Sequence, residues 1–166
     1  AFIVATQTLR LNSRLAADRR SSAAARQEQA VRDAIEAAGY SPATTPQTIT
    51  NPTIEMEPGS YSLRPRILAN ASVDVPIRLS SGHPTGLEFV ALEAKDTNSE
   101  VNSRKRLIEV AQKSHTWNSA GLPFGFRTAA VLSGCFPLPR LREAQDIGVL
   151  LFWEHRLGDL TEFLSP

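Results

Sequence analysis

Several features are scarce or missing in this chain of 166 residues. Its single cysteine, Cys135, excludes an internal disulfide and a cysteine-based zinc site. No apolar run approaches the roughly 18 residues that cross a membrane, and the first residues lack the layout of a signal peptide. Neither sign of charge dominates, because 18 Lys and Arg stand against 17 Asp and Glu, a formal net charge of +1. This balance argues mildly against nucleic-acid binding, which often uses a strongly basic surface.

The basic residues are mostly arginine. Lys95, Lys105 and Lys113 are the only lysines, and the other 15 basic residues are Arg. Arginine suits bidentate contacts with phosphate, although GC-rich coding would also enrich it. The apolar fraction of 42% and the charged fraction of 21% exclude a disordered or collagen-like chain. The length fits one domain. We expect a fragment of a longer protein, because the chain starts inside a predicted helix without an initiator Met.

The order of apolar runs and turn residues predicts an α/β fold with a mixed sheet. The first forty residues are predicted as two helices that break near Ser21 and Ser22, the second ending at Gly39. The proline-rich segment 41–63 is predicted as an irregular loop outside the packed core. Strands are predicted near 64–71, 74–80, 87–95, 126–136 and 147–155, and further helices over 101–118 and 157–164. The core is therefore an α-β-β-β-α-β arrangement whose central sheet is flanked by helices.

The turn-rich segment 81–86 joins two strand-like runs and predicts a hairpin. A fold about its middle, between His83 and Pro84, fixes which residues oppose each other. The predicted pairs are Val75 with Leu92, Ile77 with Val90, Leu79 with Glu88, and Asp74 with Glu93. Strand alternation then directs Lys95 to the same face as Glu93. Pro76 cannot donate to the ladder, so it implies an edge or a bulge and leaves the exact register open.

Asp74, Glu93 and Lys95 form a set of charges that an ordinary sheet would avoid. Two directly opposed carboxylates, with Cβ atoms roughly 4.5–5.5 Å apart, repel each other. A divalent cation removes the repulsion, because Mg²⁺ is held by one or two carboxylates together with water and phosphate oxygens. An adjacent lysine can hold and help to deprotonate an attacking water, or stabilise charge on a phosphate. The alternative is that these are solvated strand ends, with Glu93 and Lys95 forming an ordinary ion pair.

An acid that opens one strand, a hairpin, and Glu93-Ala94-Lys95 at the end of the next strand resemble the PD-(D/E)xK nuclease superfamily. Further segments, taken in order, are similar to the catalytic part of XamI-type restriction endonucleases. These segments are Asn98-Ser99, 101–107, 129–134 and 151–157. The resemblance implies a restriction-endonuclease-like core in a cytoplasmic bacterial enzyme. It also implies Mg²⁺-dependent hydrolysis of double-stranded DNA, with Mn²⁺ as a substitute metal, by a homodimer that matches a palindromic target.

The resemblance assigns roles to individual residues. Asp74 and Glu93 would be the metal ligands and Lys95 the catalytic lysine. Many nucleases of this superfamily add an acid from the first helix, and Glu28 fits that position. The alternative for Glu28 is an exposed charge on a helix.

A polar and basic cluster begins the helix that follows the Glu93-Ala94-Lys95 strand. Its position and its helix N-terminus suit contacts with phosphates next to the scissile one. The candidates are Asn102, Arg104, Lys105 and Arg106, with Gln112 and Lys113 two turns later. The alternative is a solvated basic helix face. Two rival functions also stay open: a junction-resolving or repair nuclease on the same scaffold, and a module that binds DNA or protein without cutting.

Overall fold

The computed structural model describes the backbone of residues 2–97 and 99–166, and the side chains of residues 13–97 and 99–166. Asn98, which belongs to one of the matching segments, lies outside the described residues. The elements in chain order are α1 (Phe2–Ala37), β1 (Ser41–Ala43), β2 (Thr48–Ile49), α2 (Pro52–Glu55), β3 (Ser60–Ser62), β4 (Arg66–Leu68), β5 (Ala71–Val73), β6 (Val75–Arg78), β7 (Phe89–Asp96), α3 (Glu100–Ser119), β8 (Phe126–Ser133), α4 (Leu138–Asp146), β9 (Leu150–Trp153), a 3₁₀ turn (Glu154–Arg156) and α5 (Leu157–Leu164).

A mixed six-stranded sheet in the order β1-β3-β6-β7-β8-β9 forms the centre of the molecule. The strands β7, β8 and β9 run parallel, whereas β6 is antiparallel to both of its neighbours. Residues 89–93 of β7 are all buried, as expected for a strand covered on both faces. The predicted mixed α/β fold is confirmed.

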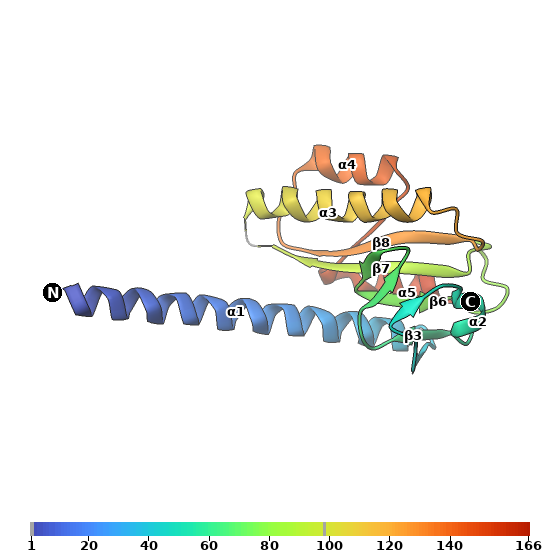
Figure 1. Ribbon diagram of the computed structural model, residues 1–166, viewed down its shortest axis with the longest axis horizontal. Helices are drawn as coiled ribbons and strands as arrows, with labels where there is room; N and C mark the ends of the chain where they lie inside the picture. The colour runs from blue at the N-terminus through green and yellow to red at the C-terminus, as the bar shows by residue number, and fades with distance from the viewer. Residues whose placement is uncertain (1, 98) are drawn as a thin grey trace.

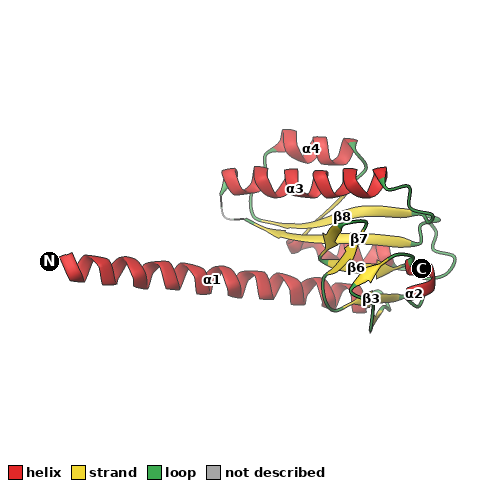
Figure 2. Ribbon diagram, viewed as in Figure 1, coloured by secondary structure: helices red, strands yellow, loops and turns green. Residues whose placement is uncertain are grey.

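Helices cover both faces of the sheet (Figures 1 and 2). The second half of α1 and the helix α5 pack on one face, where Val31 and Leu160 join Val90 and Leu92 of β7 in one apolar core. The helices α3 and α4 lie on the other face. Side chains of β7 therefore alternate between the two layers, and Glu93 and Lys95 fall on the α3 side. No helix in the described part of the chain is both long enough and apolar enough to cross a membrane.

The predicted hairpin register is confirmed. Val75 pairs with Leu92 and Ile77 with Val90, and the Leu79 N–H donates to the Glu88 carbonyl at 2.9 Å. By the alternation of an antiparallel ladder, the nitrogen of Pro76 faces away from β7. The pairing of β6 with β3 ends at Ile77, so Pro76 meets no strand on that side. This local edge is why the proline is tolerated without a bulge in the ladder with β7.

The predicted irregular loop over 41–63 is wrong in part. The strands β1 and β3 of this segment belong to the six-stranded sheet, and Tyr61 is fully buried. The prolines Pro46, Pro52 and Pro58 lie outside its strands, and Pro42 lies in the edge strand β1, where a missing N–H is tolerated. The proline-rich composition of this segment therefore gave no sign of the short strands between the prolines.

The single strand predicted near 64–71 is also wrong. It is divided by a turn at Ala69 and Asn70, whose φ values are 44° and 65°. The resulting strands form a separate three-stranded sheet in which β4 lies between β2 and β5. In the main sheet, β6 therefore lies between β7 and β3, and neither β4 nor β5 pairs with it.

The predicted helix break near Ser21 and Ser22 is absent, because α1 is one continuous helix from Phe2 to Ala37. Serine in a helix interior costs only about half a kcal/mol relative to alanine, and neither Gly nor Pro interrupts residues 2–38. The predicted C-terminal signal is confirmed by Gly39, whose φ is +92°. The first half of α1 extends well beyond the sheet (Figure 1).

Candidate active site

The three residues singled out by the sequence meet at the C-terminal end of β7. Asp74 lies between β5 and β6, at the point where the chain leaves the small sheet and enters the large one. Its backbone N–H donates to Oε1 of Glu93 at 3.2 Å, and its Oδ2 accepts the N–H of Ala94 at 3.0 Å. The backbone of each strand thus orients the carboxylate of the other.

Lys95 bridges the two carboxylates. Its Nζ lies 3.2 Å from Oδ2 of Asp74 and 2.8 Å from Oε2 of Glu93. The Glu93 side chain is completely buried and that of Lys95 is 10% exposed, whereas that of Asp74 is 31% exposed. Asp74 is therefore the carboxylate that solvent or a ligand reaches first.

Lys113 completes the group, which we call the carboxylate–lysine cluster: Asp74, Glu93, Lys95 and Lys113. From α3, the Nζ of Lys113 donates to Oε2 of Glu93 at 2.7 Å. Sequence reasoning treated Lys113 only as a candidate phosphate ligand, because its spacing from β7 gave no sign of this contact. Packing of α3 on the sheet brings the two residues together.

Burial sets the electrostatics of the cluster. It raises the pKa of Glu93, and the charge of Asp74 adds to this rise, while Lys95 and Lys113 oppose it without cancelling it. Burial alone would lower the pKa of Lys95, but the charges of Glu93 and Asp74 outweigh this and raise it. The pKa of Lys95 is therefore raised by the two carboxylates, and the pKa of Glu93 is raised by burial although two ammonium groups contact its Oε2.

The donor set fits a hard divalent cation. Asp74 and Glu93 supply carboxylate oxygens, which Mg²⁺ prefers, and one or two such ligands suffice because Mg²⁺ keeps several waters. In the described residues no group of three or more His, Cys, Asp or Glu side chains is arranged to hold a metal. Glu28, the candidate third acid, lies on the exposed face of α1 and lines the groove. It does not form such a group with Asp74 and Glu93.

Gln27, the neighbour of Glu28, is a site residue that sequence reasoning missed. It is 2% exposed, and its Nε2 lies 3.3 Å from both the Lys95 carbonyl and the Val131 carbonyl. One side chain of α1 thus ties the ends of β7 and β8 together behind the cluster. A signal was present, because Gln27 lies four residues before Val31 on the apolar stripe of the helix.

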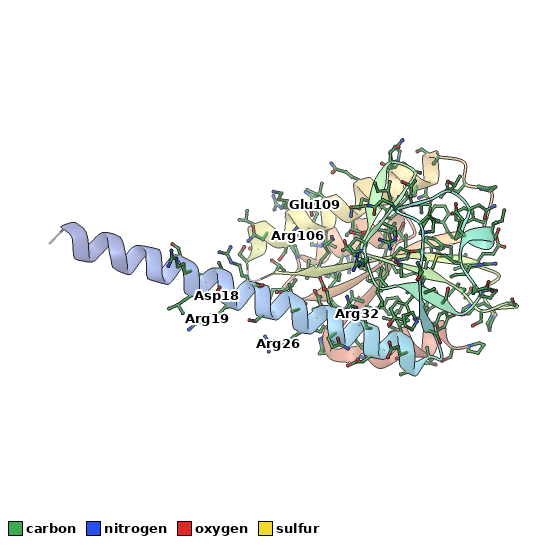
Figure 3. The ribbon with its side chains drawn as sticks, turned by 60° about the horizontal axis from the view of Figure 1, so that its bottom comes forward. Asp18, Arg19, Arg26, Arg32, Arg106 and Glu109 are labelled. Carbon is green, nitrogen blue, oxygen red and sulfur yellow. The ribbon has the colours of Figure 1, made fainter. Side chains whose placement is uncertain are left out.

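A groove of about 1200 Å³ leads to the cluster. Asp74 and Lys95 lie at its floor, α1 forms one wall, and the start of α3 forms the other. Of the predicted phosphate ligands, Asn102, Lys105 and Arg106 line this groove, whereas Arg104 and Gln112 are exposed outside it. Figure 3 shows Arg106 on α3 and Arg19, Arg26 and Arg32 on α1.

The wall formed by α3 is anchored to the sheet. Ser99 caps the helix by accepting the N–H of Asn102, and the buried Ser103 hydroxyl donates to the carbonyl of Cys135 after β8. Gly134 allows this close packing, since a Cβ there would overlap the Thr97 carbonyl oxygen. The basic start of α3 is therefore held in a defined position relative to Lys95.

The sequence matches the profile of the XamI restriction endonuclease over residues 1–153. The chain belongs to the XamI restriction endonuclease family. Membership in the XamI family implies a type II site-specific deoxyribonuclease, with DNA as its substrate. Neither the curated proteins nor the solved structures contain a significant match to this XamI-family chain.

Proposed function

We propose that this protein is the catalytic portion of a type II restriction endonuclease, a single domain with a restriction-endonuclease-like core. It hydrolyses phosphodiester bonds of double-stranded DNA in the presence of Mg²⁺. The observation that carries the proposal is the contact of Lys95 with both Asp74 and Glu93 at the floor of the groove. Family membership supports the reaction class, and the cluster supports the residues.

The residues at the groove have different roles in the proposed reaction. Asp74 and Glu93 would hold the metal, which would supply Lewis acidity. The Lys95 ammonium orients the attacking water and stabilises negative charge on the phosphate that enters the groove. Glu28, which faces the groove from α1, is the candidate for a further acid near that water. Asn102, Lys105 and Arg106 hold phosphates next to the scissile one.

The products would carry a 5′-phosphate and a 3′-hydroxyl. A palindromic target, cut on both strands, requires two active sites related by a two-fold axis. The active species is therefore a homodimer, with one cluster for each strand.

Cleavage of plasmid DNA with and without Mg²⁺ tests this function. Wild-type protein should give discrete bands only with metal, and Lys95→Ala should lower the rate at least about a hundredfold, the usual cost of removing one charge-stabilising donor. Arg142→Ala, at an exposed position on α4 outside the groove, is the control and should cleave normally. Full activity of Lys95→Ala would disprove the catalytic assignment. Cutting of branched or damaged DNA alone would favour a resolvase or repair nuclease, and DNA binding without any cleavage would favour a binding module.

A further inference from the structure

The groove has a second wall that no motif of the sequence indicated. Ten residues of α1 line it, and they recur in pairs every four residues, from Leu15 and Ala16 to Val31 and Arg32. Residues four apart lie on one face of a helix. The face that packs on the sheet at Val31 therefore continues beyond the sheet as the wall of the groove. We call residues 13–26, all of which are exposed or only partly buried, the α1 arm.

The charge of the groove differs from that of the whole chain. Six cations and three carboxylates line it, whereas the whole molecule carries a net charge of only +1. The carboxylates are Glu28, Asp74 and Asp96. Arg19 and Arg20 provide the positive charge on the α1 arm, opposite Lys105 and Arg106 on α3. Both walls therefore present cations to whatever occupies the groove.

We infer that the groove-lining face of the α1 arm is a DNA-backbone contact surface, in which Arg19 and Arg20 bind phosphates that flank the scissile one. This inference rests on the proposed nuclease function, because the same groove ends at Asp74 and Lys95. A polyanion that places one phosphate at this floor must pass between the two walls. The exposed arginines of the arm are suited to bidentate contacts with its phosphates.

The helix geometry sets the reach of the arm. Arg20 lies seven residues before Gln27, which packs behind the cluster, and this spacing corresponds to about 11 Å along the helix axis. Base pairs follow one another at about 3.4 Å along DNA. The arm therefore contacts the backbone about three base pairs from the scissile phosphate if the duplex follows the groove.

A pair of matched double variants tests this surface. Arg19→Gln with Arg20→Gln removes two charges from the groove, and Arg14→Gln with Arg26→Gln removes two charges from α1 at positions that do not line it. Gln resembles Arg in helix propensity, so helicity by circular dichroism should be equal in both. The binding of a fluorescent duplex is measured by anisotropy in EDTA, which prevents cleavage, over a series of salt concentrations.

We expect the groove variant to bind at least tenfold more weakly than wild type at low salt. The slope of log affinity against log salt should be smaller by about two, because each phosphate contact contributes about 0.9. The control variant should stay within about threefold of wild type, with a nearly unchanged slope.

Other outcomes overturn the inference in distinguishable ways. Equal binding by both double variants, with wild type binding DNA, would overturn the role of the arm and leave the nuclease proposal standing. Absence of DNA binding by wild type would overturn both. A change of molecular mass in the groove variant, with DNA binding like that of the control, would instead assign the arm to contact with a second copy of the chain.

Discussion

The carboxylate–lysine cluster and the groove walls above it both carry charge, but in opposite physical settings. In the cluster every charged group is wholly or partly buried and has a partner within 3.2 Å. On the walls Arg19, Arg20, Lys105 and Arg106 are exposed. An ion removed from a buried cluster leaves another uncompensated, whereas an exposed ion is solvated whether or not it is paired. Substitutions in the cluster should therefore depend on one another, whereas the effects of substitutions on the walls should add.

The substitution Glu93→Gln in the cluster should have the largest effect. This change keeps the size of the side chain but removes the most buried charge of the cluster. Metal-ion stabilisation is worth several kcal/mol, so we expect DNA cleavage to fall by about a thousandfold. The measurement is the rate of plasmid cleavage at saturating Mg²⁺, with folding checked by circular dichroism. Cleavage within tenfold of wild type by a folded variant would contradict the role of Glu93.

The next largest effect should follow from Lys113→Met. It removes one of the two ammonium groups at Oε2 of Glu93 and leaves a buried carboxylate with fewer partners. The expected loss is about 1–3 kcal/mol in the free energy of unfolding, measured by urea denaturation without metal. Mg²⁺ should restore part of it, because the cation replaces the missing charge, so the metal should raise Tm more in this variant than in wild type.

Lys113→Arg is the control, since it keeps a cation at this position and should lose less stability. An identical Mg²⁺ effect on Tm in wild type and in Lys113→Met would show that Lys113 is not coupled to the metal position.

A pH dependence follows from the same carboxylate. Burial, together with the charge of Asp74, raises the pKa of Glu93 above its ordinary value of 4.5. The folded metal-free protein thus holds this proton more tightly than the unfolded chain. The stability that this gives is complete below the unfolded-state pKa and is lost as pH rises through the raised pKa. Mg²⁺ needs the ionised form, so its affinity should rise over the same interval.

The measurement is the increase in Tm caused by Mg²⁺, taken in steps from about pH 4 to about pH 8. The increase should grow with pH over the interval that begins near the ordinary value of 4.5, and Glu93→Gln should lack this step. A pH-independent increase in wild type would show that the Glu93 proton does not compete with the cation.

The smallest effect should come from Glu109→Gln, the same chemical change made in the exposed region. Oε2 of Glu109 lies 3.3 Å from Nη1 of Arg106, one turn away on α3 (Figure 3). Such exposed pairs are worth about 0.3–0.5 kcal/mol, so the free energy of unfolding should change by no more than this. Freed from its partner, Arg106 should bind duplex DNA slightly more tightly, by up to about twofold, as measured by anisotropy. A loss of more than about 1 kcal/mol in the free energy of unfolding would contradict the distinction between the buried cluster and the exposed walls.

Local pattern predicted the part of the site that lies on one hairpin. Strand alternation directs Glu93 and Lys95 to one face, and the turn at 81–86 sets Asp74 opposite them. Both follow from spacing over a short stretch of chain, where backbone geometry leaves few alternatives. The helix α3 and the buried strand β8 were predictable for the same reason.

Contacts between distant segments were not predictable. Lys113 reaches Glu93 only because α3 packs on the sheet, and Gln27 reaches the Lys95 carbonyl only because α1 packs on the opposite face. The short strands β1 and β3 owe their conformation to pairing partners rather than to their own proline-rich composition. Propensity is a weak prior for such segments, and tertiary pairing overrides it.

The sequence by itself determined the alternation of helices and strands, the hairpin register and the identity of three of the four charges in the cluster. Tertiary structure alone decided that Lys113 is the fourth, that α1 continues past the sheet as one helix, and that residues 15–32 of this helix face the start of α3 across a groove. The physical reason is the range of the interactions. Backbone periodicity acts over a few residues and is written in the spacing of side chains, whereas the pairing of buried charges and the shape of the groove depend on how separate elements pack.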